Sequence, residues 1–545
     1  MPTTHEVFNQ VPPRGAVDEF ALNLPLVEAV ATYDAGWALD QLGVIGRQVG
    51  SEEFQKDAER ANRVEPVLRT HDSYGHRIDE VVYDDSYTRI ISAAVAAGAH
   101  TSAWADPKPG ANVARAATFM LFAQVEPGHA CPISMTHSAA AAVSASPSLA
   151  DKWMPRLLSR QYDGALGGAG EPPKASALFG MAMTEKQGGS DVRANTTRAV
   201  LQSDGAYLLT GHKWFCSAPM SDGFLVLAQA PEGLSCFLLP RVLDDGNRNT
   251  FRIQRLKDKL GNRSNASSEV EFDDTVAFLL GDEGRGVRTI IEMVSRTRLD
   301  CVLGTAAGVR QGVAEAAWHV RHRQAFGRLL VDQPAMTAVL ADLALESEAA
   351  TATAMRLARA HDADADATEL AFRRLATAVS KYWICKRGPE HAYEALECLG
   401  GNGYTEAFPL ARRYREQPVM AIWEGSGNVI ALDVLRALAR EPEAFEAFDA
   451  EVSRASGSSR EFDTHLMRTR ALVIEAAASE QDAAARLARR LVAELALSLQ
   501  ASLLIRTAPA AVSDAFIASR LGENRGHLYG ELPASADLNS ILARA

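Results

Sequence analysis

One carboxylate in this chain lies on a glycine-rich bend, in the segment Trp423-Glu424-Gly425-Ser426-Gly427-Asn428. Apolar residues precede Glu424, and a carboxylate beside them loses hydration, which raises its pKa and makes it a stronger base toward a weak carbon acid. The glycines let backbone N–H groups approach a ligand, and Ser426 or Asn428 can cap a helix. Taken alone, the segment fits an ordinary helix start with a solvated glutamate better. The other motifs favour the base.

Two earlier segments could face a planar or phosphorylated ligand. Ala182-Met183-Thr184-Glu185-Lys186-Gln187-Gly188-Gly189-Ser190-Asp191 combines an exposed glycine backbone with hydroxyl donors. Gly211-His212-Lys213-Trp214-Phe215-Cys216-Ser217 reads as a strand whose aromatic residues could line the ring of a cofactor. A polar hairpin loop and plain sheet packing are the respective alternatives.

Two later segments carry features of phosphate binding. The basic cluster Arg321-His322-Arg323-Gln324-Ala325-Phe326-Gly327 suits a pyrophosphate, because arginine offers a forked pair of donors, although a solvated basic face is the commoner explanation. The loop Glu397-Cys398-Leu399-Gly400-Gly401-Asn402-Gly403-Tyr404 resembles a phosphate-approach loop. It does not follow a strand in a βαβ unit, which disfavours a nicotinamide-binding Rossmann domain.

The composition excludes several classes of protein. The 545 residues should form three or four domain-sized units, and no stretch is long and apolar enough for a membrane span. The N-terminus lacks the pattern of a secretory signal, so we expect a cytoplasmic protein. Six scattered cysteines argue against a zinc site or a disulfide framework. A net charge of −12 makes nucleic-acid binding a poor default, although a local basic patch could still bind DNA.

The hydrophobic pattern divides the chain into helical and β regions. Up to about residue 180 the pattern is mainly helical, with a surface loop expected at Glu171-Pro172-Pro173-Lys174. Short apolar runs at 207–210, 224–229, 236–239, 270–272 and 276–280 predict an antiparallel β domain, a small barrel or sandwich. Helical spacing returns at Val287, Ile290, Ile291 and Val294, and again at Met336, Val339, Leu340 and Leu343. Leu487, Leu491 and Leu495 predict a helix in the last hundred residues, which the segment Glu451–Ser459 should separate from the body.

In this order, the segments resemble the acyl-CoA dehydrogenase family of flavoproteins over about residues 110 to 440. Further matching pieces are Lys259–Ser264, Gly281–Gly286 and Thr297-Arg298. The resemblance implies an α+β protein with the acyl-CoA dehydrogenase fold. It predicts an N-terminal helical domain (1–180), a middle flavin-binding β-barrel domain (181–283), a C-terminal four-helix bundle (284–440) and a helical extension (441–545).

The resemblance also assigns roles to residues. It implies that Glu424 is the catalytic base that removes the α-proton of an acyl-CoA thioester. FAD contacts fall on Met181, Met183, Thr184, Gly189, Ser190, Phe215, Cys216, Ser217, Trp423, Gly425, Ser426 and Asn428. Arg323, Phe326, Gly400 and Gly401 would reach the adenine-dinucleotide part of FAD from a neighbouring subunit, which implies a homo-oligomer, usually a tetramer. Arg298 and Arg436 are the expected substrate contacts.

The segments Gly180–Val192, Arg255–Ser267 and Tyr414–Asn428, with the long C-terminal extension, resemble the AidB branch of bacterial alkylation-response flavoproteins. Members of that branch are associated with protection against DNA methylation damage and with binding of double-stranded DNA through the extension. Arg486, Arg489 and Arg490 have the i, i+3, i+4 spacing of a basic stripe, and a solvated helix face near Asp482 and Glu494 explains them at least as well.

Three positions depart from the family pattern. Phe215 occupies the place of a family tryptophan, with Trp214 one position early, Glu397 replaces a glutamine before the Gly-Gly loop, and Pro334 replaces another glutamine. We therefore predict flavin binding with weak or restricted acyl-CoA dehydrogenation and possible duplex-DNA binding. The alternatives are an ordinary metabolic acyl-CoA dehydrogenase for a short or branched substrate, and a flavin-containing scaffold without chemistry.

Overall fold

The computed structural model describes residues 4–168, 174–522 and 526–545, and it contains two compact units built from interleaved parts of the chain. Unit 1 comprises Met1–Gln55, Lys108–Val125 and Cys301–Ala545, and unit 2 comprises Lys56–Pro107 and Glu126–Asp300. Residues 171–173 of the surface loop expected from the sequence lie outside the described residues. The predicted division into four consecutive domains stays a prediction.

Unit 2 contains a closed barrel, in which β6, β4, β5, β9 and β7 pair in order and β7 pairs again with β6. Seven strands form this sheet: β3 (Phe179–Ala182), β4 (Arg198–Leu201), β5 (Tyr207–Ser217), β6 (Gly223–Ala230), β7 (Gly233–Pro240), β8 (Arg252–Leu256) and β9 (Ser267–Leu280). The barrel confirms the predicted β domain. The prediction that all strands run antiparallel is wrong, because β3 runs parallel to β6. The two apolar runs at 270–280 form one strand, not two.

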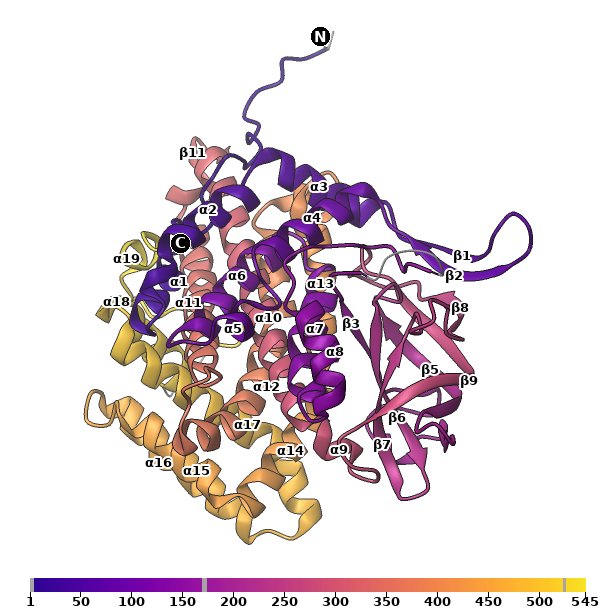
Figure 1. Cartoon of the computed structure of the whole chain (residues 1–545). Helices are drawn as coiled ribbons and strands as arrows, with labels where there is room; N and C mark the ends of the chain where they lie inside the picture. Colours follow the sequence, from indigo (N-terminus) through magenta and orange to yellow (C-terminus); the bar gives the residue numbers. More distant parts are fainter. Residues whose placement is uncertain (1–3, 169–173, 523–525) are drawn as a thin grey trace. The chain divides into compact units, whose positions relative to one another are not determined.

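Helices and a separate hairpin complete unit 2. The helices are α4 (Asp85–Ala96), α5 (Ser102–Ala105), α7 (Ala130–Val143), α8 (Pro147–Leu157) and α9 (Gly286–Thr289). The hairpin consists of β1 (Val67–His71) and β2 (Arg77–Val82) (Figure 1). The prediction of a mainly helical N-terminal region did not include it. The signal for it is Asp72-Ser73-Tyr74-Gly75, where the Asp72 carboxylate accepts the Tyr74 and His76 N–H groups as in a tight turn.

Unit 1 is a bundle of long, alanine-rich helices. Its helices up to residue 440 are α1 (Leu24–Thr32), α2 (Leu39–Val49), α6 (Ala111–Ala123), α11 (Pro334–Arg359), α12 (Ala367–Glu397), α13 (Pro409–Met420) and α14 (Gly427–Arg440). The helices α3 (Glu52–Arg63) and α10 (Ile291–His322) run from one unit into the other. Small side chains let these helices approach closely, and every residue of α6 is buried.

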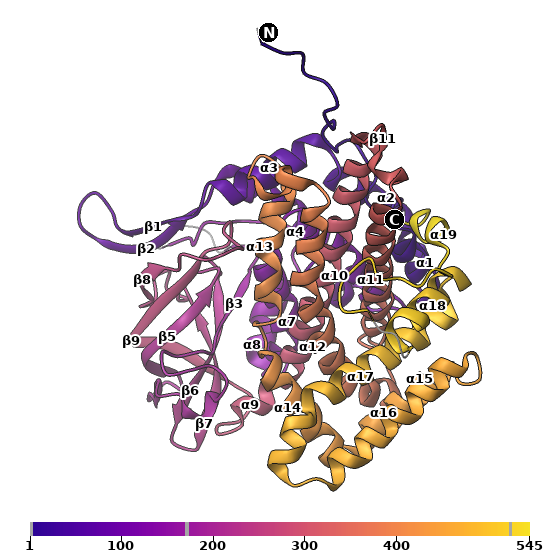
Figure 2. The same cartoon turned by 180° about the vertical axis from the view of Figure 1, so that it is seen from behind.

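The C-terminal extension is part of unit 1. It contains α15 (Pro442–Ser453), α16 (Arg460–Ala478), α17 (Gln481–Thr507), α18 (Ala510–Phe516) and α19 (Leu538–Leu542), and Figure 2 shows α16 and α17 side by side. The prediction that Glu451–Ser459 separates the extension from the body is wrong, because its first residue joins the two. Glu451 is buried and binds Arg356 of α11 at 3.0 Å and Arg506 of α17 at 2.7 Å. This ion-pair network fixes the extension to the bundle.

One predicted helical stripe fails for a local reason. Ile290 is buried, but Val287 and Ile291 are exposed, because the backbone breaks at Ile290 between α9 and α10 and the helical phase starts again. The stripe of α17 is confirmed at Leu491 and Leu495, which are both buried. Within the described ranges, no helix combines the length and the apolar character that crossing a membrane requires.

Candidate functional site

Glu424 lies in a tight turn between α13 and α14, and its backbone is left-handed. Its φ is +58°, and Gly425 follows with φ +112°. A glutamate in this region carries a conformational cost of about 1 to 3 kcal/mol, which persists only where the surrounding structure imposes it. Such strain is common at functional sites. Ser426 is the N-cap residue of α14, as the sequence suggested, although its side chain makes no capping hydrogen bond.

A buried lysine binds the backbone of this turn. Lys381 of α12 is 1% exposed, and its Nζ donates to the carbonyl oxygens of Ala421 at 3.3 Å and Gly425 at 2.5 Å. These two carbonyls flank Glu424 on either side along the chain. Because a buried ammonium needs such partners, its charge and the shape of the turn stabilise each other. No motif distinguishes Lys381 from other helical lysines, so the sequence did not predict it.

The packing around the turn explains Gly427. A Cβ at this position would lie 2.4 Å from Cε of Lys386, so a larger residue would displace the end of that lysine side chain. The pKa of Lys386 is lowered, first by burial and then by the positive charges of Arg489 and Lys381. Gly427 therefore has a structural role beside the ligand approach that the sequence suggested.

The apolar environment expected for Glu424 is only partly present within unit 1. Met420 packs with Cys301 and Cys385 beneath the turn, and the half-buried Trp423 lies against this cluster. Ile422, in contrast, is 64% exposed, and Glu424 is half-buried. Ile422 therefore points to the surface although it lies close to Glu424 in sequence, because the chain changes direction within the tight turn.

In unit 2, the glycine-rich segment after β3 is anchored by a buried ion pair. Glu185 lies 2.9 Å from Lys213, both side chains are fully buried, and Thr196 and Thr197 donate further hydrogen bonds to its carboxylate. Burial raises the pKa of Glu185, but these hydrogen bonds and Lys213 outweigh it and hold the pKa well below its usual value. The segment is therefore a rigid turn. Sequence reasoning did not identify the Glu185–Lys213 pair.

The predicted flavin contacts of this segment lie at its rim. A Cβ at Gly189 would lie 2.5 Å from Oγ1 of Thr184, so the glycine lets the threonine hydroxyl occupy that space. Thr184 is half-buried and Ser190 is exposed, whereas Met181 is buried and Met183 half-buried. The carbonyl of Thr184 accepts the N–H of Trp214 at 2.9 Å, which joins the turn to β5.

A β-bulge explains the displaced tryptophan in β5. The pairing with β9 shifts register between Lys213 and Cys216, so Trp214 and Phe215 both face away from the barrel core. Phe215 is 52% exposed, and Trp214 is covered by the ammonium of Lys257, 3.3 Å from the ring centre. Bulges redirect side chains beside active sites, and this one presents two aromatic rings where the family pattern has one.

The last two residues of β5 have different environments. Cys216 belongs to the barrel core and is fully buried, so its side chain does not reach the surface that the predicted flavin contact requires. Burial raises the pKa of this thiol to about 12. Ser217 is half-buried, and its Oγ lies 3.1 Å from Oγ of Ser267 in β9.

The basic cluster begins at the end of α10 with Arg321 and His322 and continues into a small hairpin in unit 1, with β10 (Gln324–Ala325) and β11 (Arg328–Leu329). At its tip Phe326 has φ +52° and is 97% exposed. Arg323 is not fully available, because its guanidinium donates to the carbonyl of Asn9, whose side chain also binds the Gln324 backbone. Asn9 was not predicted, since nothing in the sequence relates it to residue 323.

The loop at Gly400 is open. It forms a short 3₁₀ turn, η4 (Gly400–Tyr404), where Gly400 has φ +60°. A Cβ at Gly400 or Gly401 would meet no described atom within 4 Å, so both glycines are accessible to a ligand. Glu397, the departure from the family glutamine, accepts a hydrogen bond from Tyr393 and raises the pKa of that tyrosine.

The predicted substrate and DNA contacts are distributed over both units. Arg298 is half-buried in α10, and Arg436 is largely exposed on α14, 3.6 Å from Asp433. Arg486, Arg489 and Arg490 are exposed on α17, and Nε of Arg489 donates to the Tyr382 hydroxyl at 3.1 Å. The basic stripe therefore contacts the helix that carries Lys381.

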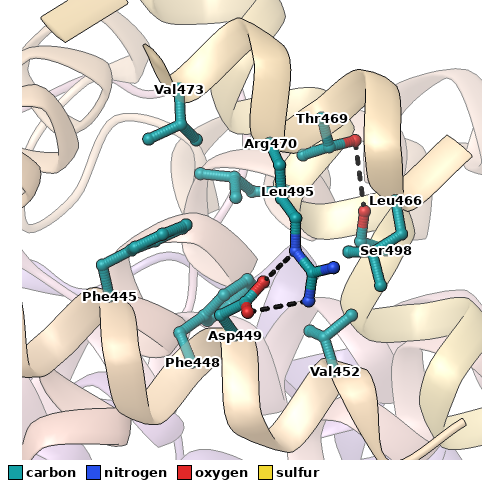
Figure 3. A pocket seen from close by; sticks show the side chains of 10 residues that line it. All are labelled: Phe445, Phe448, Asp449, Val452, Leu466, Thr469, Arg470, Val473, Leu495 and Ser498. Atoms are coloured by element: carbon teal, nitrogen blue, oxygen red, sulfur yellow. Dashed lines mark hydrogen bonds and ion pairs between the residues drawn. The ribbon is translucent and has the colours of Figure 1, made fainter. Parts of the chain in front are cut away.

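A small pocket in the extension is separate from these motifs. It lies between α15, α16 and α17, as Figure 3 shows, where Arg470 binds Asp449 at 2.8 Å and Ser498 donates to Thr469 at 3.4 Å. Its remaining lining is mainly apolar, from Phe445, Phe448, Val452, Leu466, Val473 and Leu495. The arginine is already paired, so the pocket reads as imperfect helix packing.

Three family models match consecutive parts of the chain. The adaptive response protein AidB N-terminal domain matches residues 9–164, the acyl-CoA dehydrogenase middle domain matches 180–275, and the acyl-CoA dehydrogenase C-terminal domain matches 284–439. These matches correspond to the order of motifs in the sequence.

Similar proteins of known sequence or structure belong to the same family as these models. The chain is 45% identical to the "Putative acyl-CoA dehydrogenase AidB" of Escherichia coli, over 85% of this chain and 86% of that protein. It is 28% identical to "Acyl-CoA dehydrogenase family member 11" of Caenorhabditis elegans, over 76% and 69%. Among solved structures, Caenorhabditis elegans ACDH-11 in complex with C11-CoA superposes with a TM-score of 0.85 at 24% identity, over 99% of this chain and 93% of that one.

Proposed function

This chain belongs to the acyl-CoA dehydrogenase family and resembles the AidB protein in it, and on that basis we propose that it oxidises the Cα–Cβ bond of an acyl-CoA thioester with FAD as cofactor. The observation that supports this most directly is the strained Glu424 turn, which buried Lys381 holds in place. FAD, when bound, accepts the hydride from Cβ. Glu424 removes the proton from Cα.

The residues present in the chain fit the cofactor. Unit 2 offers an exposed aromatic ring at Phe215, the Thr184 hydroxyl beside Gly189, and the Ser217 hydroxyl at the end of β5. Unit 1 offers the open Gly400–Gly401 backbone and the exposed ring of Phe326. Donors, glycines and aromatic rings are the groups that a flavin and a pyrophosphate require.

The chain's own residues would supply proton abstraction and stabilisation of negative charge. The Glu424 carboxylate takes the α-proton, and its backbone N–H, which the family resemblance assigns to the thioester oxygen, stabilises the enolate charge that develops. These two effects contribute on the order of 5–9 kcal/mol in sites of this kind. The substrate class is supported by the relative whose structure contains C11-CoA.

The test is Glu424→Gln, which keeps the size of the side chain and removes the base. We expect the variant to retain FAD and to lose acyl-CoA dehydrogenation, measured as anaerobic bleaching of the flavin by a panel of acyl-CoA thioesters. Wild-type protein that no thioester bleaches would support the flavin scaffold without chemistry. Unchanged bleaching in Glu424→Gln would remove Glu424 from the role of base.

Duplex-DNA binding in an alkylation response is a second candidate function. It is supported by the similarity to AidB and by the exposure of Arg486, Arg489 and Arg490 on α17. The neighbouring acid Glu494 lies 3.4 Å from His465, so it is partly engaged elsewhere. The net charge of −12 confines any such binding to a local patch.

A salt titration tests this second function. Binding through three arginines should weaken by about tenfold or more when salt rises from 50 to 200 mM, since each phosphate contact releases counterions. Replacing the three arginines by glutamine should remove most of that dependence. Absent or salt-insensitive binding of the wild-type protein favours the purely metabolic function.

A further inference from the structure

A lysine is linked through two serines to the end of β5 in unit 2. Nζ of Lys259 lies 3.2 Å from Oγ of Ser267, which lies 3.1 Å from Oγ of Ser217. Ser217 and Ser267 are directly paired residues of β5 and β9, so the strand register fixes their contact. Lys259 is itself held by the carbonyl of Asn265, at 2.5 Å from Nζ. We call Lys259, Ser267 and Ser217 the serine relay.

The chemistry of the three groups gives the relay a direction. A lysine ammonium can only donate, so Ser267 Oγ accepts the hydrogen bond from Lys259. Among the residues that the structure describes, Ser217 Oγ is the one side-chain acceptor within reach of the Ser267 hydroxyl proton. This arrangement assigns Ser267 as the donor to Ser217, because it gives the Ser267 proton an acceptor. The hydroxyl proton of Ser217 is then left to point away from Ser267, toward a ligand.

We propose that Lys259 is a positioning residue for the flavin, which acts through Ser267 to turn the Ser217 hydroxyl into a donor directed at an acceptor atom of the isoalloxazine ring. This inference rests on the proposed function, because it requires FAD beside Ser217. It goes beyond that function by assigning the control of the flavin's reduction potential to residues outside the ring's immediate contacts.

The relay should stabilise the reduced flavin relative to the oxidised flavin. The reduced ring carries more negative charge on its acceptor atoms than the oxidised ring. A donor polarised by a lysine stabilises that charge, since hydrogen bonds assisted by an ionised group are roughly twice as strong as neutral ones. Breaking the relay should therefore lower the midpoint potential of bound FAD.

The experiment measures the midpoint potential of bound FAD in the purified full-length protein by equilibration with a reference dye. We expect Lys259→Met and Ser267→Ala each to make two-electron reduction about tenfold less favourable, which corresponds to a fall of about 30 mV. The double variant should fall no further than either single variant, because both break the same relay. Ser217→Ala serves as the reference for complete loss of the donor.

Lys257→Met is the matched control, because it removes a positive charge from the same segment without touching the relay. Lys257 lies 2.6 Å from Glu269 and covers Trp214. Its potential shift should be clearly smaller than that of Lys259→Met. Equal shifts in the two lysine variants would mean a general charge effect and would overturn the relay, as would additive shifts in the double variant.

The failures of the relay and of the proposed function are distinguishable. Wild-type protein that binds no FAD contradicts the proposed function itself. FAD binding with a shifted potential in Ser217→Ala, but a wild-type potential in Lys259→Met and Ser267→Ala, contradicts only the relay. Lys259→Met could disturb the loop at Asn265. Ser267→Ala is then the cleaner test, because this substitution removes a single oxygen and leaves the lysine in place.

Discussion

At the scale of single residues, the strained backbone of Glu424 is the feature that links this sequence to its proposed chemistry. A left-handed glutamate is retained at a conformational cost, and the ammonium of Lys381 on the carbonyls of Ala421 and Gly425 offsets it. The position of the carboxylate therefore depends on a side chain some forty residues earlier in the chain. Small errors in such positions reduce rates strongly, because the reacting atoms must be close and aligned.

We predict that Lys381→Met lowers the turnover number for acyl-CoA dehydrogenation about 10- to 100-fold while FAD content and KM change little. The deuterium isotope effect with an α-deuterated substrate should increase, because proton abstraction becomes slower than the other steps. Lys386→Met removes a lysine from the same helix without touching these carbonyls, and it should not increase the isotope effect. A wild-type isotope effect and turnover in Lys381→Met would rule out this positioning role.

At the scale of secondary-structure elements, the contacts that hold the extension to the bundle include two buried polar networks. One joins Glu451 of α15 to α11 and α17. The other brings Arg520 and Tyr529 of the C-terminal segment to α11 and α12. Its members are Arg520 with Asp342 and Glu346, Arg387 with Glu346, and the Tyr529 ring at 5.6 Å from His391. Breaking either network leaves buried charges unpaired, so the extension cannot detach without cost.

The second network should respond to acid in a defined window. Burial lowers the pKa of His391 from its usual 6.5 to about 4, with Arg387 adding to the effect and Glu346 opposing it. An unfolded histidine binds its proton at pH 6.5 and the folded one only near pH 4, so the stabilisation is complete above pH 6.5 and is lost as the pH falls to 4. We predict a loss of about 3 kcal/mol of unfolding free energy across this window.

His391→Gln provides the check by urea denaturation at several pH values. The variant should lack the slope between pH 6.5 and 4, which we assign to His391, although it is less stable at neutral pH. It should keep the loss at lower pH, since the pKa of Glu346 and of Glu451 is held at about 2 by their arginine partners despite burial. An unchanged slope in His391→Gln would contradict the assignment.

For the whole molecule, the exposed tip of the β10–β11 hairpin suggests that the single chain is not the complete functional form. Phe326 is 97% exposed on a left-handed backbone, and Tyr404 beside the open glycines is 86% exposed. Large aromatic side chains without cover often mark interaction sites. The homo-oligomer, which the family resemblance implies as a tetramer, stays a prediction that these exposed rings support.

We predict that Phe326→Ser leaves the unfolding free energy of the chain within about 0.5 kcal/mol, because the ring makes few contacts in it. FAD affinity should fall about tenfold or more, since covering an aromatic side chain contributes about 1.5–3 kcal/mol. Urea denaturation measures the unfolding free energy, and titration of the apoprotein with FAD measures the affinity. Wild-type FAD affinity in this variant would show that residue 326 does not reach the cofactor.

The sequence by itself determined the order of motifs and the helical and β regions, because glycines, hydroxyls and hydrophobic periodicity act locally along the chain. The resemblance of those motifs indicated the family and made Glu424 the candidate base. The tertiary structure decided what no local pattern contains. Two contacts join positions far apart in sequence: Lys381 binds the Glu424 turn, and Asn9 binds Arg323. In the serine relay, Lys259 and Ser267 are close in sequence, but the strand pairing joins them to the distant Ser217. The bulge that exposes both Trp214 and Phe215 depends on pairing with β9, so only the folded sheet reveals it.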